Sequence, residues 1–219
     1  MNSADLETVP ATLRERVAHM CRQLYGRGWM EGTSGNVSVR SGEAVLISAS
    51  GCAKGTLDHR DTVLVDAGNG RPLTGETRRP SAETAIHLAF YSEYPDCGAV
   101  VHAHAPYSTA LASLPLFRRA GKDVAHVEFA DMELAKGLGV DDPSRVRVPV
   151  FANWPEVSRI AADVGVYLRA NPPSTMAGLL IDRHGVTTWG RDLDHARNRL
   201  ECVEALCHLS LLMNGTTTT

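Results

Sequence analysis

The sequence lacks the features that mark secreted, membrane-spanning and nucleic-acid-binding proteins. Its five cysteines are odd in number and form no C-x-x-C pair, so reduced thiols are expected and a cysteine-based zinc site is not. No apolar run approaches the roughly 20 residues that a membrane helix needs, and the first residues carry no basic-then-apolar signal segment. A net charge of -3, with scattered Lys and Arg, offers no basic face. We therefore expect a cytoplasmic protein that binds neither membrane nor nucleic acid.

The remaining composition is that of an ordinary globular protein, with 43% hydrophobic and 21% charged residues in a chain of 219. This length favours one domain spanning residues 1–219. Apolar periodicity predicts helices over residues 10–27, 81–95, 107–113, 155–171 and 192–213, and a short one within 129–139. Strands are predicted around 37–39 and 45–47, at the start of 62–73, within 98–105 and on both sides of 184–185. These elements predict an α/β fold in which helices cover a sheet.

Two histidines stand at strand spacing in "GAVVHAHAPYSTA", residues 98–110. Alternate side chains of a strand face the same way, so His102 and His104 are expected to point to one side together. A catalytic zinc usually takes three protein ligands and keeps one position open. The third candidate is His184, beside a glycine at the end of an apolar strand, and His126 is the competitor that spacing alone leaves open.

Small polar residues gather in two turns near the first predicted strands. They are Ser34, Gly35 and Asn36 in the first turn, and Ser50 and Gly51 in the second. Their backbone N–H groups could approach a phosphate closely, although such clusters are most often simply turns. Lys54 is a further candidate cation for this site. The alternative interpretation is that it is a solvated lysine of a loop.

Five ordered motifs cover nearly the whole chain: "EGTSGNVSVR", "LISASG", "RRPSAETAIH", "VVHAHA" and "DRHGVTTWG". In order and spacing they resemble the class II aldolase/adducin family. The resemblance implies a three-layer αβα fold with a mainly antiparallel central sheet, and homotetramers with sites between subunits. It also implies one divalent metal, usually zinc, held by His102, His104 and His184, and a sugar-phosphate substrate. Because the three imidazoles are neutral, such a metal keeps most of its positive charge and can polarise a ketone as a Lewis acid.

The same resemblance assigns roles to residues around the metal. It places the phosphate on the S-G-N, S-G and P-S segments, the last of which adds Ser81. Glu83 matches the glutamate that family aldolases use as the proton-transferring base. A glutamate at a helix start is also ordinary, because it complements the helix dipole.

The stretch "FADMELAKGLG" distinguishes among reactions within the family. It resembles the E-x-x-K-G/A-L element of methylthioribulose-1-phosphate dehydratases of methionine salvage, whose glutamate acts as catalytic acid/base and matches Glu133. The alternative for Glu133 is a solvated residue paired with Lys136 or Lys122. Related aldolases use a tyrosine near the C-terminus, which "CHLSLLMNGTTTT" lacks.

Three functions follow as hypotheses. The first is a hydro-lyase acting on 5-methylthioribulose 1-phosphate, and the second is a class II ketose-1-phosphate aldolase of the fuculose- or 5-deoxyribulose-phosphate type. The third is a non-catalytic adducin-like interaction domain, which has no use for an open metal site. Departures from the dehydratase pattern at Glu31 and Cys52 leave the exact 5-substituted pentulose phosphate open.

Overall fold

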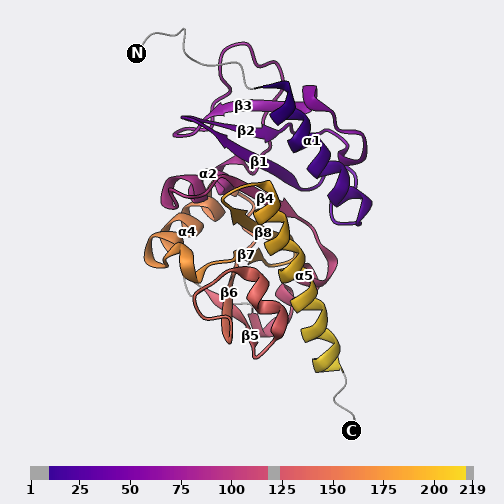
Figure 1. Ribbon diagram of the computed structural model, residues 1–219, viewed down its shortest axis with the longest axis vertical. Helices are drawn as coiled ribbons and strands as arrows, with labels where there is room; N and C mark the ends of the chain where they lie inside the picture. Colours follow the sequence, from indigo (N-terminus) through magenta and orange to yellow (C-terminus); the bar gives the residue numbers. More distant parts are fainter. Residues whose placement is uncertain (1–9, 118–123, 216–219) are drawn as a thin grey trace.

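The computed structural model describes residues 10–117 and 124–215, which form an eight-stranded sheet with α-helices on both faces (Figure 1). The strands are β1 (Asn36–Ser41), β2 (Ala44–Ser48), β3 (Thr62–Asp66), β4 (Ala99–Ala103), β5 (Ala125–Ala130), β6 (Arg145–Phe151), β7 (Gly178–Ile181) and β8 (Gly185–Gly190). The α-helices are α1 (Ala11–Gly26), α2 (Thr84–Glu93), α3 (Pro106–Ala112), α4 (Val157–Ala170) and α5 (Leu193–Gly215). Short 3₁₀ helices are η1 (Lys54–Thr56), η2 (His59–Asp61), η3 (Pro115–Phe117), η4 (Glu133–Leu138) and η5 (Pro173–Thr175).

The sheet has the strand order β3-β2-β1-β4-β8-β7-β6-β5. Every neighbouring pair is antiparallel except β6 and β7, which are parallel over two residue pairs. The predicted mainly antiparallel sheet is therefore confirmed. The order also places β4, the strand with the H-x-H pair, next to β8 in the middle of the sheet.

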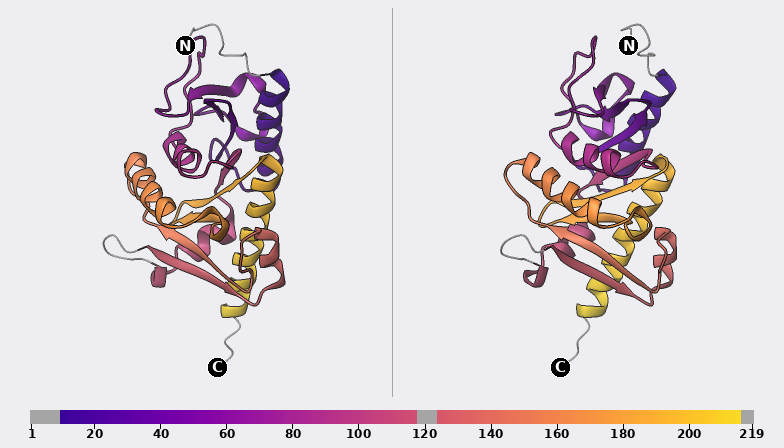
Figure 2. Two further views of the ribbon diagram at one scale, coloured as in Figure 1. Left: turned by 60° about the vertical axis from the view of Figure 1, so that its left-hand side comes forward. Right: turned by 90° about the vertical axis from the view of Figure 1, so that its left-hand side faces the viewer.

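Alternating side chains divide the core into two layers, one on each face of the sheet. On β4, Val101 packs into the layer that α1, α3 and α5 cover, whereas Val100 packs into the layer under α2 and α4. Figure 2 shows α4 and α5 on opposite sides of the sheet. Because each face of the sheet is buried by helices, the predicted three-layer αβα arrangement is confirmed.

Among the described helices, none combines the length and apolar character needed to cross a membrane. Even α5, with 23 residues, alternates charged and apolar residues along its sequence.

Candidate functional site

Four side chains from three separate parts of the sequence meet at one end of β4. They are Glu83, His102, His104 and His184, and their ligand atoms all lie within 4.8 Å of one another. His102 ends the apolar run of β4 and His104 follows two residues later, so both project to the same face. His184 lies in the turn between β7 and β8, and Glu83 immediately precedes α2. The β4–β8 pairing brings that turn to the H-x-H pair.

The contacts within this group are close. Nε2 of His184 lies 2.6 Å from Oε1 of Glu83, and Nε2 of His102 lies 3.3 Å from Oε2. The Nε2 atoms of His102 and His104 are 3.2 Å apart. The three imidazole rings stand nearly perpendicular to one another, with centroids 4.9–5.1 Å apart. Their Nε2 atoms therefore converge on one small volume.

Contacts outside the group orient two of the rings. Nδ1 of His102 lies 2.9 Å from Oγ1 of Thr187, and Nδ1 of His184 lies 3.2 Å from Oδ1 of Asn153. We assign the ring hydrogen of His184 to Nδ1, since the amide oxygen of Asn153 can only accept, and we place that of His102 on Nδ1 as well, where the Thr187 hydroxyl can accept it. The Nε2 lone pairs then face the group and the Glu83 carboxylate. So many hydrogen-bond acceptors this close together require a proton or a cation between them. The same nitrogen and oxygen atoms form a ligand set that fits a divalent metal ion.

Electrostatics keeps the group in a form suited to metal binding. Burial acts to raise the pKa of Glu83, but the nearby His102 opposes this effect. Contacts with His184 and Asn36 lower it further, so the pKa of the Glu83 carboxyl lies well below its usual range. Burial lowers the pKa of His102 to about 4 and also lowers the pKa of His104. At neutral pH the carboxylate is ionised and these imidazoles are neutral, as metal ligands must be.

Asn36 connects this group to the first small-residue turn. Its Nδ2 donates to Oε2 of Glu83 over 2.6 Å, and within the described residues its buried Oδ1 has no hydrogen-bond partner. Asn36 also pairs with His102 across β1 and β4. A buried acceptor left without a donor costs free energy, so this oxygen is available to a hydroxyl or N–H group of a bound molecule.

The three segments expected to bind phosphate lie close to one another. Gly35, with φ +72°, approaches the metal strand so closely that a Cβ there would lie 3.0 Å from the His102 carbonyl oxygen. Ala49 and Pro80 form an isolated bridge, and the N–H of Ser50 donates to the carbonyl of Arg79. Ser50 and Gly51 are thereby placed beside the P-S segment that contains Ser81.

Lys54 is not on the surface. Its side chain is 1% exposed, and Nζ donates to the carbonyls of Thr33 and Cys52 over 3.0 Å each. Burial lowers the pKa of this ammonium. The lysine is therefore buried beneath the two turns and joins them through its hydrogen bonds. The alternative interpretation from the sequence, that Lys54 is a solvated loop residue, is wrong.

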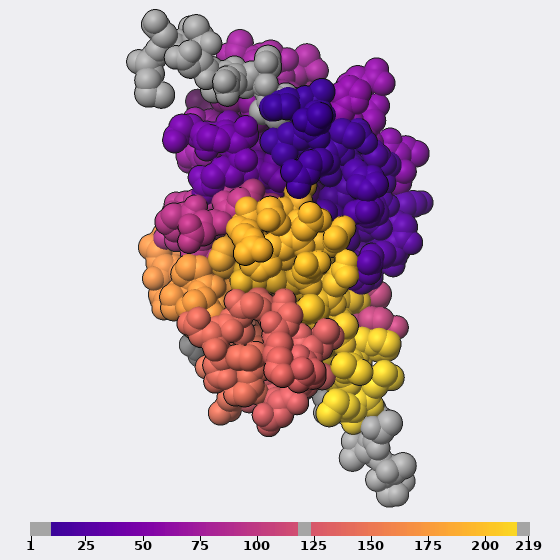
Figure 3. Space-filling view, viewed as in Figure 1, coloured from indigo at the N-terminus to yellow at the C-terminus, as the bar shows by residue number. Residues whose placement is uncertain are grey.

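Glu133 is not among the residues that the structure brings together at this site. Its side chain is 85% exposed on η4 and forms an ion pair of 2.7 Å with Lys136. Lys122, the other partner considered, lies outside the described residues. The segment containing η4 lies on the surface beside α5 (Figure 3). Within one chain, Glu133 contacts neither the histidines nor Glu83.

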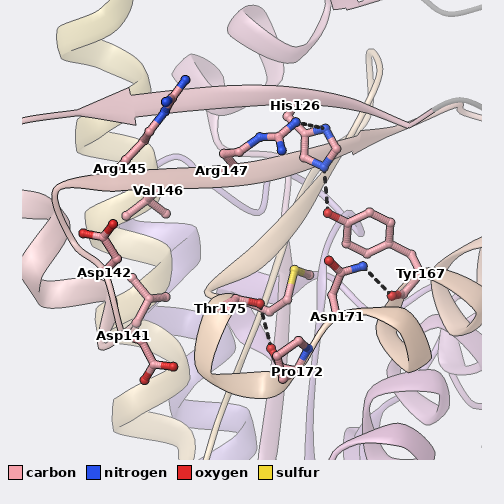
Figure 4. A pocket seen from close by; sticks show the side chains of 12 residues that line it. His126, Asp141, Asp142, Arg145, Val146, Arg147, Tyr167, Asn171, Pro172 and Thr175 are labelled. Atoms are coloured by element: carbon pink, nitrogen blue, oxygen red, sulfur yellow. Dashed lines mark hydrogen bonds between the residues drawn. The ribbon is translucent and has the colours of Figure 1, made fainter.

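His126, the competing third ligand, lies in a different part of the molecule. It lines a cavity of about 320 Å³ on the β5–β6 side of the sheet (Figure 4). Its Nε2 lies 2.7 Å from the hydroxyl of Tyr167, and a guanidinium N–H of Arg147 donates to its Nδ1. Both ring nitrogens thus have partners of their own, and the geometry favours His184 as the third member of the group.

Known proteins resemble this chain over most of its length. A model of the class II aldolase and adducin N-terminal domain matches residues 15–211. The methylthioribulose-1-phosphate dehydratase of Sorangium cellulosum is 38% identical over 216 residues, which cover 97% of this chain and 95% of the relative. A probable bifunctional methylthioribose-1-phosphate isomerase/methylthioribulose-1-phosphate dehydratase of Nocardia farcinica is 48% identical over 206 residues, or 93% of this chain. Those residues span only 36% of the bifunctional protein.

Solved structures share the fold. YgbL from Escherichia coli has a TM-score of 0.75 at 27% identity, over 93% of this chain and 90% of its own. An L-fuculose 1-phosphate aldolase has a TM-score of 0.77 at 22% identity, over 96% of this chain and 90% of its own, a likeness that shows the fold alone. With the family model matched over residues 15–211 and a relative aligned along nearly its full length, the chain belongs to the class II aldolase and adducin family.

Proposed function

We propose that this protein is a metal-dependent hydro-lyase that converts 5-methylthioribulose 1-phosphate into 2,3-diketo-5-methylthiopentyl 1-phosphate and water, in methionine salvage. The observation that carries the proposal is the convergence of three histidines and Glu83 in a chain that aligns end to end with relatives named for this dehydration. The reaction needs a Lewis acid, an anion site and an acid/base, and candidate residues exist for each.

In this proposal His102, His104 and His184 hold one zinc ion per subunit. Three imidazoles with one position left open are the common ligand set of catalytic zinc. The contacts of Thr187 and Asn153 with two of the rings support the assignment, because metal-binding histidines usually have such a partner at the second ring nitrogen. When bound, the ion supplies Lewis acidity toward the ketone oxygen of the substrate.

The phosphate of the substrate binds to the small-residue segments, at Ser34, Gly35, Asn36, Ser50, Gly51 and Ser81. Turns of this kind present backbone N–H groups and hydroxyls without side-chain obstruction. The close approach of Gly35 to the carbonyl of His102 supports this placement, since it puts the phosphate next to the metal strand.

Two carboxylates are assigned to proton transfer, Glu133 as acid/base and Glu83 as a residue that orients the substrate or shares the base role. A carboxylate removes the proton from carbon 3, and the electron pair forms the carbon 3–carbon 4 double bond as the carbon 4–oxygen bond breaks. The departing hydroxyl takes a proton and leaves as water. The remaining enol at carbon 3 then tautomerises to the 2,3-diketone.

The exposure of Glu133 favours a site completed by a second copy of the chain, and we propose a homotetramer. Glu133 cannot act on the metal-bound end of a substrate from its position within one chain. Leu134 of η4 and Tyr107 of α3 are each 39% exposed and line a cavity of about 630 Å³. Apolar side chains left exposed around such a hollow are typical of a surface that another subunit covers.

We further propose that residues 1–219 act as a single domain in the cytoplasm. The continuous sheet from β3 to β5 supports the first statement, and five free cysteines support the second.

The test is to incubate the purified, metal-loaded protein with 5-methylthioribulose 1-phosphate and to identify the product by mass. Loss of one water molecule is expected, and His184→Ala protein is the control for background dehydration. Release of a three-carbon phosphate would instead establish the aldolase reaction, with cleavage between carbons 3 and 4. An unchanged substrate, with metal bound, would contradict both reactions.

A further inference from the structure

Lys54 is a fully buried cation that forms no ion pair with the described carboxylates, although the charges of Glu83 and Asp61 act on it from beyond ion-pair distance. The side chain is 1% exposed, and its two hydrogen bonds go to neutral carbonyl groups. Burying an ammonium costs much free energy unless a negative charge compensates it. Because Glu83 and Asp61 offset this cost only from beyond ion-pair distance, an anion bound at the adjacent turns would stabilise the ammonium further.

The two carbonyls belong to the two turns that flank the proposed phosphate site. Thr33 directly precedes the Ser34–Asn36 turn, and Cys52 directly follows Ser50 and Gly51. The backbone N–H of Lys54 also donates to the carbonyl of Gly32, over 2.9 Å. One residue thus connects both turns, through its main chain and its side chain.

The pairing of β1 with β2, together with the Val37 N–H that donates to Oγ of Ser48, fixes the strand ends next to these turns, and Lys54 adds a direct connection between the turns themselves. Ser34, Ser50 and Gly51 are at least partly exposed, and glycine and serine contribute few packing contacts of their own. The buried ammonium of Lys54, bonded to both turns, can hold them at the spacing that a phosphate requires. No free energy is then spent on reorganising the turns when the phosphate binds.

We infer that Lys54 is a positioning residue for phosphate: it fixes the two turns relative to each other, and the negative charge of the bound phosphate compensates its buried ammonium. This inference rests on the proposed function, because it assumes that the turns bind the substrate phosphate. It differs from a direct-ligand role, in which the ammonium would be exposed between the turns and hydrogen-bonded to the anion.

The alternative is that Lys54 serves stability alone, and a neighbouring cation provides the comparison. A guanidinium N–H of Arg22 donates to the carbonyl of Leu57, just beyond η1, and so ties α1 to the same segment without contacting either turn. Arg22→Met removes a cation–carbonyl contact next to the same segment, together with an ion pair to Glu15. If Lys54 were purely structural, Lys54→Met would resemble Arg22→Met: a lower melting temperature and unchanged phosphate binding.

The experiment measures binding of inorganic phosphate to metal-loaded wild-type, Lys54→Met, Lys54→Gln and Arg22→Met proteins by calorimetry, together with KM, kcat and metal content. Loss of a charge-assisted interaction corresponds to about a 10–100-fold change in affinity. We therefore expect phosphate affinity to fall, and KM to rise, by at least about tenfold in both Lys54 variants. Metal content should stay stoichiometric and kcat should change far less. Lys54→Gln keeps hydrogen-bond donors and serves if Lys54→Met does not fold.

Two failures are distinguishable. If wild-type protein binds phosphate and a folded Lys54 variant binds it equally well, the inference is overturned while the proposed function stands. If the wild-type protein itself binds no phosphate, the proposed phosphate site is wrong, and the inference fails with it.

Discussion

Nε2 of His184 lies 2.6 Å from Oε1 of Glu83, although the contact of its Nδ1 with Asn153 directs a lone pair, not a hydrogen, toward that carboxylate. Two acceptors at this distance repel each other unless a proton or a metal ion lies between them. Protons and metal therefore compete for the same position, and metal affinity should fall as the pH is lowered.

The first prediction concerns the ligands. Replacing His184 by Ala should remove most of the bound metal and with it the activity, because only two imidazoles and Glu83 would remain. Metal-to-protein ratio after dialysis, measured by atomic emission, checks this result. The control is His126→Ala, which should keep a full complement of metal since His126 contacts Arg147 and Tyr167 instead. Full occupancy in folded His184→Ala protein would refute the assignment.

The second prediction concerns Thr187, whose hydroxyl lies 2.9 Å from Nδ1 of His102. Thr187→Val preserves the shape of the side chain but removes the hydrogen-bond partner of the ring. Loss of such a partner typically costs about 10–100-fold in metal affinity, which competition with a chromophoric chelator would measure. Thr188→Val is the matched control: its hydroxyl is also buried, but it donates to the carbonyl of Ala196, away from the site. Equal affinities in the two variants would exclude an orienting role for Thr187.

Much of the metal group could be predicted because it depends on local patterns. The H-x-H spacing on an apolar strand places His102 and His104 on one face whatever the rest of the fold does. His184 was recognisable from its position at the end of a strand next to glycine. Asn153 and Thr187 were not recognised, because their roles depend on strand register and loop position. Thr187 faces His102 only through the pairing of β4 with β8.

Two strands were not predicted, and their sequences explain why. β6 contains Pro149, which is unfavourable in the middle of a sheet. The structure accommodates it because the parallel ladder with β7 begins only at Val150. β5 is an edge strand beside it, in which polar and apolar residues alternate over only six residues. The exposure of Glu133 and the burial of Lys54 could not be predicted from the sequence either, because local composition does not determine which side of a turn the fold covers.

The third prediction concerns pH and His87, a buried histidine of α2 that is not one of the metal-binding candidates. Burial, followed by the proximity of His102, lowers the pKa of His87 to about 3. In the unfolded chain it should titrate near its ordinary value of about 6.5. The unfolded state therefore takes up a proton first as the pH falls. The stabilisation from neutral His87 is complete above about pH 6.5 and is lost progressively toward pH 3.

Between pH 7 and pH 5, the wild-type protein should thus lose about 2 kcal/mol more of its free energy of unfolding than His87→Gln does. Gln retains a polar group for the hydrogen bond that Nδ1 shares with Ser38. Urea denaturation of both proteins at the two pH values gives the comparison. Parallel pH dependences would show that His87 does not have the lowered pKa.

The fourth prediction concerns assembly. Light scattering should report a tetramer, and co-expression of His184→Ala with Glu133→Gln should restore activity that neither variant has alone. In a ring of four with each site shared by neighbours, random mixing rebuilds about a quarter of the sites. A fully active monomer would contradict the shared site. So would a mixed tetramer without activity, since each chain would then need both residues itself.

The fifth prediction decides the chemistry and concerns Glu133. Glu133→Gln preserves the size of the side chain and its hydrogen bonding but cannot take up a proton. Positioned acid–base catalysis contributes about 10²–10⁴-fold, so kcat should fall by that order while metal content and phosphate binding are unchanged. Glu128→Gln is the matched control, because Glu128 is a carboxylate on β5, also in an ion pair, in this case with Arg145. If both variants dehydrate at nearly the wild-type rate, Glu133 is only the partner of Lys136. The acid/base role would then pass to Glu83, which already lies among the histidines, and proton transfer would need no second subunit.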